Sequence, residues 1–238
     1  MRLRRGSSTV VVIPDLQIPY EHRDALPFIQ EVVSLVDADH VVCIGDEVDQ
    51  MALSRFDPDP DGDSAGPELK KALVRLQEWY ESFPEVRVAT SNHTGRVQKA
   101  AFKAGIPEAY MRSVGEWMQA PPGWTWHDNF TIEGVRYEHG DAQGGMYAAR
   151  NLAIRNRQST VIGHHHSHGG VYYVANESET IFGMNVGCLI DTNAIAFKYG
   201  VGSAFKPTLG CGVVTRGVPF FIPMMLTKGN RWTGEVIL

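Results

Sequence analysis

The chain has 238 residues, of which 43% are hydrophobic and 21% charged, and its formal net charge is −5 at pH 7. This composition is typical of an ordinary globular protein, and the length suits one sizeable α/β domain or two small ones with a real core; we expect residues 1–238 to form one domain. The mildly acidic balance, without a long basic run, argues against binding to extended nucleic acid.

The cysteines and the apolar stretches set the expected compartment. Cys43, Cys188 and Cys211 are odd in number, widely spaced and free of any Cys-x-x-Cys pair. They predict reduced thiols, and so a cytoplasmic protein without a disulfide frame. The apolar run at residues 10–13 is too short for a signal peptide, and no stretch approaches the length of a membrane span. We therefore expect no membrane partner.

The first half of the chain alternates strand and helix patterns. Residues 8–17 read as a buried strand that ends in polar residues, and a helix follows from about Asp24. Residues 39–49 predict a second strand, 68–83 a second helix, and 85–94 a third strand. This order predicts parallel strands joined by right-handed crossovers. Their carboxyl ends then meet at one edge of the sheet, where ligands bind in such folds.

The second half of the chain has a different pattern. Helices are expected at 96–104, 107–118 and 144–157, with strand-like stretches at 130–141 and 159–166. Four short strand candidates follow at 170–176, 179–186, 210–216 and 218–226, and turn residues favour their antiparallel pairing in a second sheet. We expect an α/β fold in which two mixed sheets pack face to face, with helices outside.

Polar side chains follow nearly every predicted strand. They are Asp15, Gln17, Asp46, Asp49, Asn92, His93, His139, Asp141, His164, His165, His166 and His168. Carboxylate, amide and imidazole ligands together suit borderline divalent ions such as Mn²⁺, Fe²⁺ or Zn²⁺. One acid placed between two such ions can bridge them.

The motifs in this set occur in a familiar order. They are Asp-x-Gln at 15–17, Gly-Asp-x-x-Asp at 45–49, Asn-His at 92–93, His-Gly-Asp at 139–141 and Gly-His-x-His at 163–166. The series resembles the calcineurin-like metallophosphoesterases from about residue 8 to about residue 190. A single motif of this length is weak support, whereas five in order, each at a strand end, are strong.

The resemblance implies roles for individual residues. Metal ligands would be Asp15, Gln17, Asp46, Asn92, His139, His164 and His166. Asp46 would bridge two divalent ions, with Mn²⁺ as first choice and Fe, Zn or Ni as the others. His93 would be the catalytic histidine, and Asn92 would also contact the phosphate. Residues 185–189 resemble a supporting loop behind the site.

Three further residues would have supporting roles in this interpretation. Asp49 would brace the site, Arg96 would contact phosphate or hold the His93 loop, and His168 would line the pocket or be solvated. His165 alternates away from the face shared by His164 and His166.

The chain departs from the family pattern at two positions. Gln17 stands where the family has a histidine, and Thr94 stands where it has an acid after Asn-His. A neutral amide oxygen is a weaker ligand than imidazole, so the first metal would be held less tightly. These exchanges leave open a second interpretation, in which the chain is a catalytically weak or inactive scaffold that acts as a binding module.

Simpler interpretations compete with the metal site. The histidines at 164–168 could form a solvated surface tract, and His139 could be a hydrogen-bonded core histidine. Residues 57–68 match an EF-hand pattern, with Asp57, Asp59, Asp61 and Glu68 at ligand positions. Prolines at 58, 60 and 67 and the lack of a second copy favour an acidic loop over a calcium site.

The expected activity is hydrolysis of a phosphoester at a two-metal centre. Without a basic groove, the expected substrate is a small phosphodiester such as a cyclic nucleotide, including a 2′,3′-cyclic one, with phosphomonoesters as the alternative. A homodimer is compatible with the sequence.

Overall fold

We describe a computed structural model of the chain over residues 6–55, 59–194 and 206–237. Its larger sheet has six strands in the order β11-β10-β1-β2-β3-β4. The strands are β1 (Thr9–Ile13), β2 (His40–Cys43), β3 (Val86–Ala89), β4 (Trp124–His127), β10 (Gly210–Thr215) and β11 (Val218–Pro223). β1 to β4 run parallel, and β10 joins β1 antiparallel.

The second sheet has five strands in the order β5-β6-β7-β9-β8. They are β5 (Phe130–Ile132), β6 (Val135–Tyr137), β7 (Ser159–Ile162), β8 (Gly169–Ala175) and β9 (Thr180–Val186). β6, β7 and β9 are parallel, whereas β5 and β8 pair antiparallel at the two edges. Both sheets are therefore mixed, as the sequence predicted.

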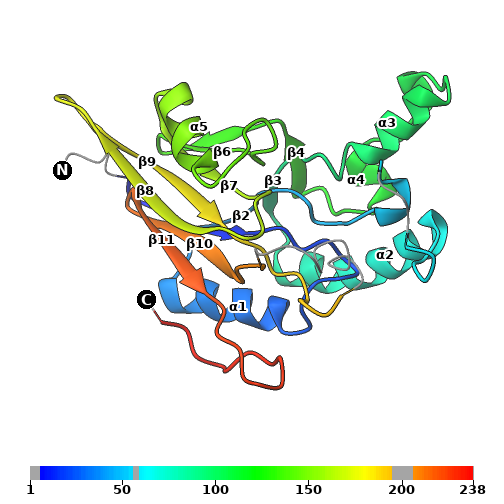
Figure 1. Ribbon diagram of the computed structural model, residues 1–238, viewed down its shortest axis with the longest axis horizontal. Coiled ribbons are helices and arrows are strands. Elements are labelled where there is room, and N and C mark those ends of the chain that lie inside the picture. The colour runs from blue at the N-terminus through cyan, green and yellow to red at the C-terminus, as the bar shows by residue number, and fades with distance from the viewer. Residues whose placement is uncertain (1–5, 56–58, 195–205, 238) are drawn as a thin grey trace.

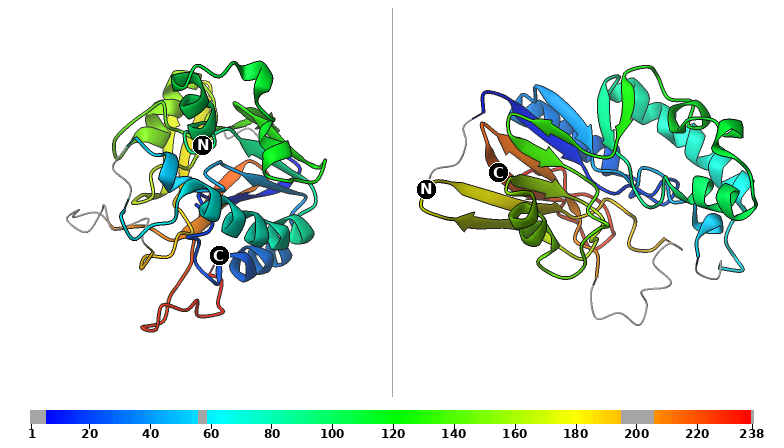
Figure 2. Two further views of the ribbon diagram at one scale, coloured as in Figure 1. Left: turned by 90° about the vertical axis from the view of Figure 1, so that its right-hand side faces the viewer. Right: turned by 90° about the horizontal axis from the view of Figure 1, so that it is seen from above.

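The longer helices are α1 (Ala25–Val36), α2 (Ala65–Ser82), α3 (Arg96–Lys103) and α5 (Ala148–Asn156), and the short ones are α4 (Val114–Trp117) and the 3-10 turns η1 (Met51–Leu53) and η2 (Glu108–Tyr110). α1 and α2 cover the outer face of the larger sheet and α5 that of the second, whereas α3 lies beyond the ends of the strands (Figure 1). α1 and α2 lie side by side (Figure 2), where Gln30 Nε2 donates to Ser82 Oγ at 3.0 Å. No helix in the described part of the chain is long and apolar enough to cross a bilayer.

Three apolar clusters separate these layers. Val11 and Ile13 of β1 face α1 and α2, whereas Val10 and Val12 face the second sheet. The consecutive valines of β1 are thus explained by burial on both faces of the strand. A third cluster packs α5 on the second sheet around Leu152. The order of layers is helix, sheet, sheet, helix.

The second sheet differs from the sequence-based expectation in membership. β10 and β11 pair with each other as predicted, but they extend the first sheet beside β1. The first five residues of β10 are buried, because helices cover one face and the second sheet covers the other. Their local sequence specifies an antiparallel hairpin and contains no signal for which sheet the hairpin joins.

Two local predictions also change. The helix expected at 107–118 is two short turns, because a new helix starts at Ser113, whose Oγ accepts from Glu116 N in a capping box. The strand β4 was not among the elements predicted from the sequence. Trp124 is buried beside β3 and donates from Nε1 to Phe83 O at 2.7 Å.

The C-terminal segment packs against the start of α1. Arg231 donates from Nε and Nη2 to the two carboxylate oxygens of Asp24, both at 2.8 Å, and Trp232 N donates to Asp24 Oδ2 at 2.9 Å. The rings of Trp232 and Phe28 meet edge to face at 5.7 Å. Asp24 thus ties residues 231–232 to the first turn of α1.

Candidate metal centre

The candidate ligands come from loops that follow strands of both sheets. Asp15 and Asp46 follow β1 and β2, and Asn92 follows β3 in the first sheet. His139 and His164 follow β6 and β7 in the second. The two sheets place the ends of these strands together, so residues from distant parts of the chain converge at one site.

Three of these side chains stand on unusual backbone. Gln17, Asp46 and His164 have φ values of 49°, 50° and 64°, which is the left-handed region that non-glycine residues rarely adopt. The surrounding hydrogen bonds hold this geometry: Leu16 N and Gln17 N both donate to Asp46 O. Such strain gathers at functional sites, where the fold aims side chains at a ligand.

Asp46, His139 and His164 form one group of ligand atoms, all within 4.8 Å of one another. His139 Nε2 lies 3.4 Å from Asp46 Oδ1 and 3.2 Å from His164 Nδ1. Asn92 Oδ1 is 3.0 Å from the same His139 Nε2. The other ring nitrogen, Nδ1, lies 2.9 Å from the carbonyl oxygen of Ile44 and fixes the ring.

Asp15, Asp46 and His166 form a second group within the same 4.8 Å limit. His166 Nε2 lies 2.9 Å from Asp15 Oδ2, and Gln17 Nε2 lies 3.4 Å from His166 Nε2. The two groups share Asp46. The structure therefore brings together all seven residues that the resemblance named as ligands.

The donor set fits divalent cations. Asp46 is 1% exposed, yet its Oδ2 accepts no hydrogen bond from the described residues. A buried carboxylate oxygen without a hydrogen-bond donor lowers the stability of the fold unless a cation binds it. Around it, imidazole nitrogens face each other and the carboxylate at 3.2–3.4 Å, an arrangement that a shared cation stabilises. A half-turn of the Gln17 amide exchanges its nitrogen and oxygen, and the oxygen can then serve as a ligand.

The protonation states follow from burial and charge. Burial would raise the pKa of the Asp46 carboxyl, but His139 and His93 outweigh burial and hold that pKa well below its usual range. Burial opposes the charge of His139, but Asp46 raises its pKa to about 10. Burial and then His139 lower the pKa of His164 to about 4. His139 thus carries a proton that a metal ion would displace.

His93 lies at the rim of the two groups and is held on both sides. Its Nδ1 is 3.1 Å from Asp49 Oδ1, and its Nε2 is 2.9 Å from Arg96 Nη2. Burial lowers the pKa of His93, but Asp46 and Asp49 outweigh it, so the net shift is upward. Arg96 also donates from Nη1 to the carbonyl oxygen of Asp49 at 2.6 Å. Arg96 and Asp49 together fix the orientation of the imidazole.

Close packing supports Asp15 from behind. A Cβ at Gly163 would lie 2.2 Å from Asp15 Oδ1, so only glycine lets the loop after β7 approach this carboxylate. His164 N donates to Asp15 Oδ2 at 2.9 Å. The backbone of the 185–189 segment pairs with Asp15 as well, since Leu189 N donates to Asp15 O. The sequence-based expectation placed this segment behind the site.

A cleft of about 530 Å³ opens over His93, Asn92 and His164. Its other walls include four cationic side chains: Arg55, Arg96, Lys99 and Lys103. Sequence reasoning missed this local positive charge because the net charge of the chain is negative. The signal was present in α3, where positions 96, 99 and 103 fall on one helical face.

Glu47 is a second residue that sequence reasoning missed, although it lies inside the Gly-Asp-x-x-Asp motif. It is 0% exposed and accepts from Trp126 Nε1 at 2.8 Å and from Thr94 Oγ1 at 3.4 Å. Burial raises the pKa of Glu47. A carboxyl group therefore sits next to Thr94, the position where the family pattern has an acid.

The remaining candidates lie further from the ligand atoms. His165 Nε2 lies 2.8 Å from Gln143 O, and its ring meets that of His164 edge to face at 5.0 Å. His168 Nδ1 lies 3.1 Å from Ser167 Oγ. In the 57–68 loop, residues 57 and 58 fall outside the described ranges. Glu68, its last acid, accepts from Met51 N and Ala52 N instead of turning toward Asp61. This geometry matches a structural role for Glu68.

Comparison with known proteins gives structural matches alone. No protein-family model matches the chain, and no curated protein matches it. Vacuolar protein sorting 29 (Vps29) from Cryptosporidium parvum aligns with a TM-score of 0.50 at 12% identity, over 97% of this chain and 94% of its own. Vps29 from Chaetomium thermophilum gives 0.48 at 11% identity, again over 97% and 94%. YfcE, a phosphoesterase from E. coli, gives 0.43 at 15% identity, over 96% and 98%.

At such identities the similarity concerns the fold and leaves activity undecided. The two packed mixed sheets and their covering helices match the fold of the Cryptosporidium Vps29 along nearly the whole chain. The chain therefore has a two-sheet α/β sandwich with flanking helices, and the fold class expected from the sequence is confirmed.

Proposed function

We propose that this chain is a metal-dependent phosphoesterase that acts on small phosphodiesters. The observation that carries the proposal is the pair of ligand groups that share Asp46, with one group completed by His139 and His164 and the other by Asp15 and His166. A shared carboxylate between two such groups is the arrangement of a dinuclear centre.

The residues would hold two divalent ions, with Mn²⁺ as first choice. Asp15, Gln17, Asp46 and His166 would bind one ion, and Asp46, Asn92, His139 and His164 the other. Bound ions would act as Lewis acids on the phosphate oxygens and lower the pKa of a coordinated water. Metal bound to His139 would require the neutral ring, so the charge of the ions would replace the protonated His139 as the partner of Asp46.

His93 is the proposed general acid. Asp49 lies 3.1 Å from its Nδ1, and Asp46 and Asp49 raise the pKa of the ring against the effect of burial. Nε2 is then available to donate to the departing oxygen of the substrate. Arg96 Nη2 lies 2.9 Å from Nε2, and a guanidinium can only donate, so Arg96 would have to turn from Nε2 toward the phosphate when Nε2 carries the proton.

The cleft supports an anionic substrate of small size. Arg55, Lys99 and Lys103 surround the opening beside His93 and complement phosphate charge. Its volume of about 530 Å³ lies in the range of small-ligand sites. This local field fits a nucleotide-sized phosphodiester, and phosphomonoesters are the second substrate class to test.

The proposal is tested with Asp46→Asn and bis-p-nitrophenyl phosphate in the presence of Mn²⁺. Loss of the bridging charge should abolish binding of both ions and reduce turnover by at least about 10³-fold. The matched control is Asp37→Asn, which makes the same exchange at an exposed aspartate with a similar φ of 48°. Metal content, measured by plasma emission spectroscopy, and turnover should both stay at wild-type values in the control.

Equal turnover by Asp46→Asn and wild type would rule out the shared-carboxylate centre. Wild-type protein that binds two Mn²⁺ ions but turns over none of a panel of phosphodiesters and monoesters would favour the second candidate, a binding module. Gln17 is the observation behind that candidate, because its amide replaces an imidazole in the first ligand group. The Cryptosporidium neighbour is likewise named for vacuolar protein sorting and not for hydrolysis.

A further inference from the structure

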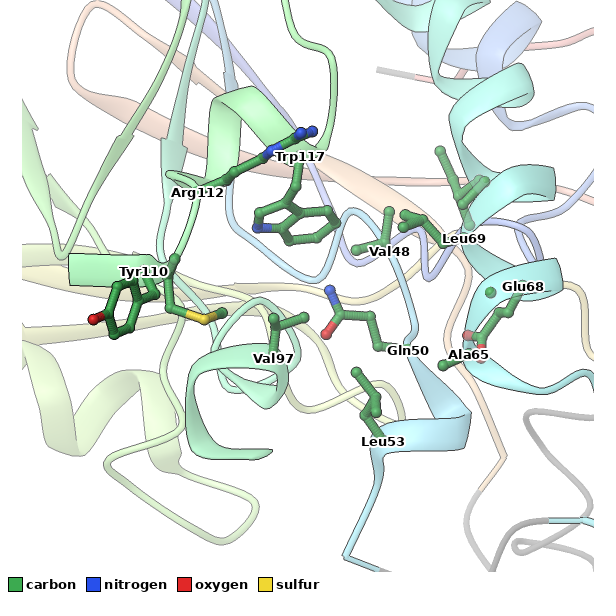
Figure 3. A pocket seen from close by; sticks show the side chains of 14 residues that line it. Val48, Gln50, Leu53, Ala65, Glu68, Leu69, Val97, Tyr110, Arg112 and Trp117 are labelled. Carbon is green, nitrogen blue, oxygen red and sulfur yellow. The ribbon is translucent and has the colours of Figure 1, made fainter. Parts of the chain in front are cut away.

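A second cavity of about 420 Å³ lies beside the metal centre, between η1, α2, α3 and the segment that leads into α4 (Figure 3). Val48, Leu69, Ala72 and Val97 make much of its wall apolar. None of these four residues is a candidate metal ligand, and none contacts His93 in the interactions described above. The cavity is therefore a separate feature of the fold.

Two polar side chains in this apolar wall have no partner among the described residues. Gln50 is 9% exposed, and neither its amide oxygen nor its amide nitrogen forms a hydrogen bond there. Trp117 Nε1 is a buried atom and donates to no described residue. In Figure 3 the amide of Gln50 points to the middle of the cavity, below the indole of Trp117. A buried polar group left without a hydrogen bond destabilises the fold, so these two side chains are retained against stability.

The backbone at Gln50 adds to this cost. Its φ is 54°, in the left-handed region that glycine or asparagine adopts more easily. The chain therefore holds an unsatisfied glutamine on strained backbone at the position directly after Asp49. Strain kept at such a position is typical of residues that bind a ligand.

The cavity adjoins the cleft that opens over His93, Asn92 and His164. Leu53 lines both of them, and the chain neighbours of Gln50 and Val97 are Asp49 and Arg96, which hold His93. A ligand with its phosphate over the metal centre can therefore place an adjoining group in the apolar cavity.

We propose that this cavity binds the purine base of a nucleotide substrate, with Gln50 and Trp117 as the specificity-determining residues. The Gln50 amide presents a donor beside an acceptor and matches the edge of adenine, where an amino group adjoins a ring nitrogen. Trp117 Nε1 donates to a further ring nitrogen, and the valine and leucine side chains cover the faces of the base. A purine fills this volume better than a pyrimidine and buries more apolar surface.

The proposal depends on the proposed function only for the phosphate end of the ligand, and binding of the base does not depend on it. Adenosine, which has no phosphate, therefore tests the cavity independently of the metal centre. Isothermal calorimetry on the full chain should give a dissociation constant below about 1 mM for adenosine. Uridine should bind at least about tenfold more weakly.

Two variants assign the binding to these side chains. Gln50→Leu should weaken adenosine binding by about ten- to a hundredfold, and Trp117→Phe by about tenfold, since one hydrogen bond is lost and the ring remains. Gln77→Leu, the same exchange at an exposed position of α2, is the matched control and should bind adenosine as wild type does. Melting temperatures identify any variant that fails to fold, in which case the other variant decides.

Substrate selectivity gives the second readout. The ratio of kcat/KM for 2′,3′-cyclic AMP to that for 2′,3′-cyclic UMP should fall toward one in Gln50→Leu. Absence of adenosine binding, equal binding of uridine, or unchanged binding in both variants would overturn the purine site. Binding of adenosine by a protein that hydrolyses no phosphoester would instead refute the proposed hydrolysis and leave the base site standing.

Discussion

His93 has a carboxylate on one ring nitrogen and a guanidinium beside the other. Asp49 lies 3.1 Å from Nδ1 and Arg96 Nη2 lies 2.9 Å from Nε2, while the pKa of the ring is raised. A histidine that protonates the leaving oxygen acts in the transition state and contributes little to ground-state binding. Loss of His93 should therefore change kcat far more than KM.

We expect His93→Ala to lower kcat by roughly 10²–10⁴-fold with bis-p-nitrophenyl phosphate, while both metal ions stay bound. Steady-state kinetics and metal analysis on the same sample measure the two effects. His127→Ala provides the control, because His127 is an exposed histidine on β4. A His93→Ala variant with wild-type kcat would refute the role of general acid.

The site could be predicted from the sequence where a motif specified both the type of residue and its position at the end of a strand. Asp15, Asp46 and His164 were identifiable because each directly follows an apolar strand, and the ends of parallel strands meet. Glu47 and Gln50 were missed for a different reason. Their significance lies in burial without enough partners, which depends on Trp126, Trp117 and other residues far along the chain.

The start of α1 shows how one buried charge can hold two elements together. Hydrogen bonds from Arg231 and Trp232 lower the pKa of Asp24 to about 2. A carboxyl whose pKa is lower in the folded than in the unfolded chain stabilises the fold above its unfolded pKa of about 4. That stabilisation is lost as the pH falls from about 4 through 2.

We expect Asp24→Asn to lower the free energy of unfolding by about 1–3 kcal/mol at pH 7, since charge-assisted bonds to Arg231 are lost. Urea denaturation of both proteins at a series of pH values measures this difference. It should shrink as the pH falls below about 4, where wild-type Asp24 begins to lose its advantage. A difference that grows toward low pH would contradict the assignment.

Elements with strong local signals were predictable, and those defined by distant partners were not. α1 and α2 follow from apolar residues at helical spacing, and the parallel order of β1, β2 and β3 follows from their crossovers. β10 belongs to the first sheet because it pairs with the edge of β1 that β2 leaves open. No property of residues 210–215 themselves distinguishes that edge from one in the second sheet.

At the scale of the molecule, the candidate metal centre joins the two sheets. Asp15 and Asp46 extend from the first sheet, and His139, His164 and His166 from loops of the second. Ions bound by both sets cross-link the sheets, and a ligand that binds only the folded state stabilises it. Metal at about 100 times its dissociation constant should add about 2.7 kcal/mol.

For a chain of this size, that stabilisation corresponds to a rise of about 5–10 °C in Tm. Scanning calorimetry with EDTA and then with excess Mn²⁺ measures the shift. The Asp46→Asn variant serves as the control and should show no such response to Mn²⁺. A wild-type Tm that is identical with EDTA and with Mn²⁺ would show that the sheets do not share a bound ion.

The placement of β1 between β2 and β10 bears on how the protein is made in the cell. Val10 to Val12 pair on one side with residues 40–42, which leave the ribosome soon afterwards, and on the other with residues 212–214. Until β10 has been translated, one edge of this valine-rich strand has no hydrogen-bonding partner, and such edges promote aggregation. A nascent chain that stalls before β10 would carry this exposed edge and would be a substrate for chaperones and proteases.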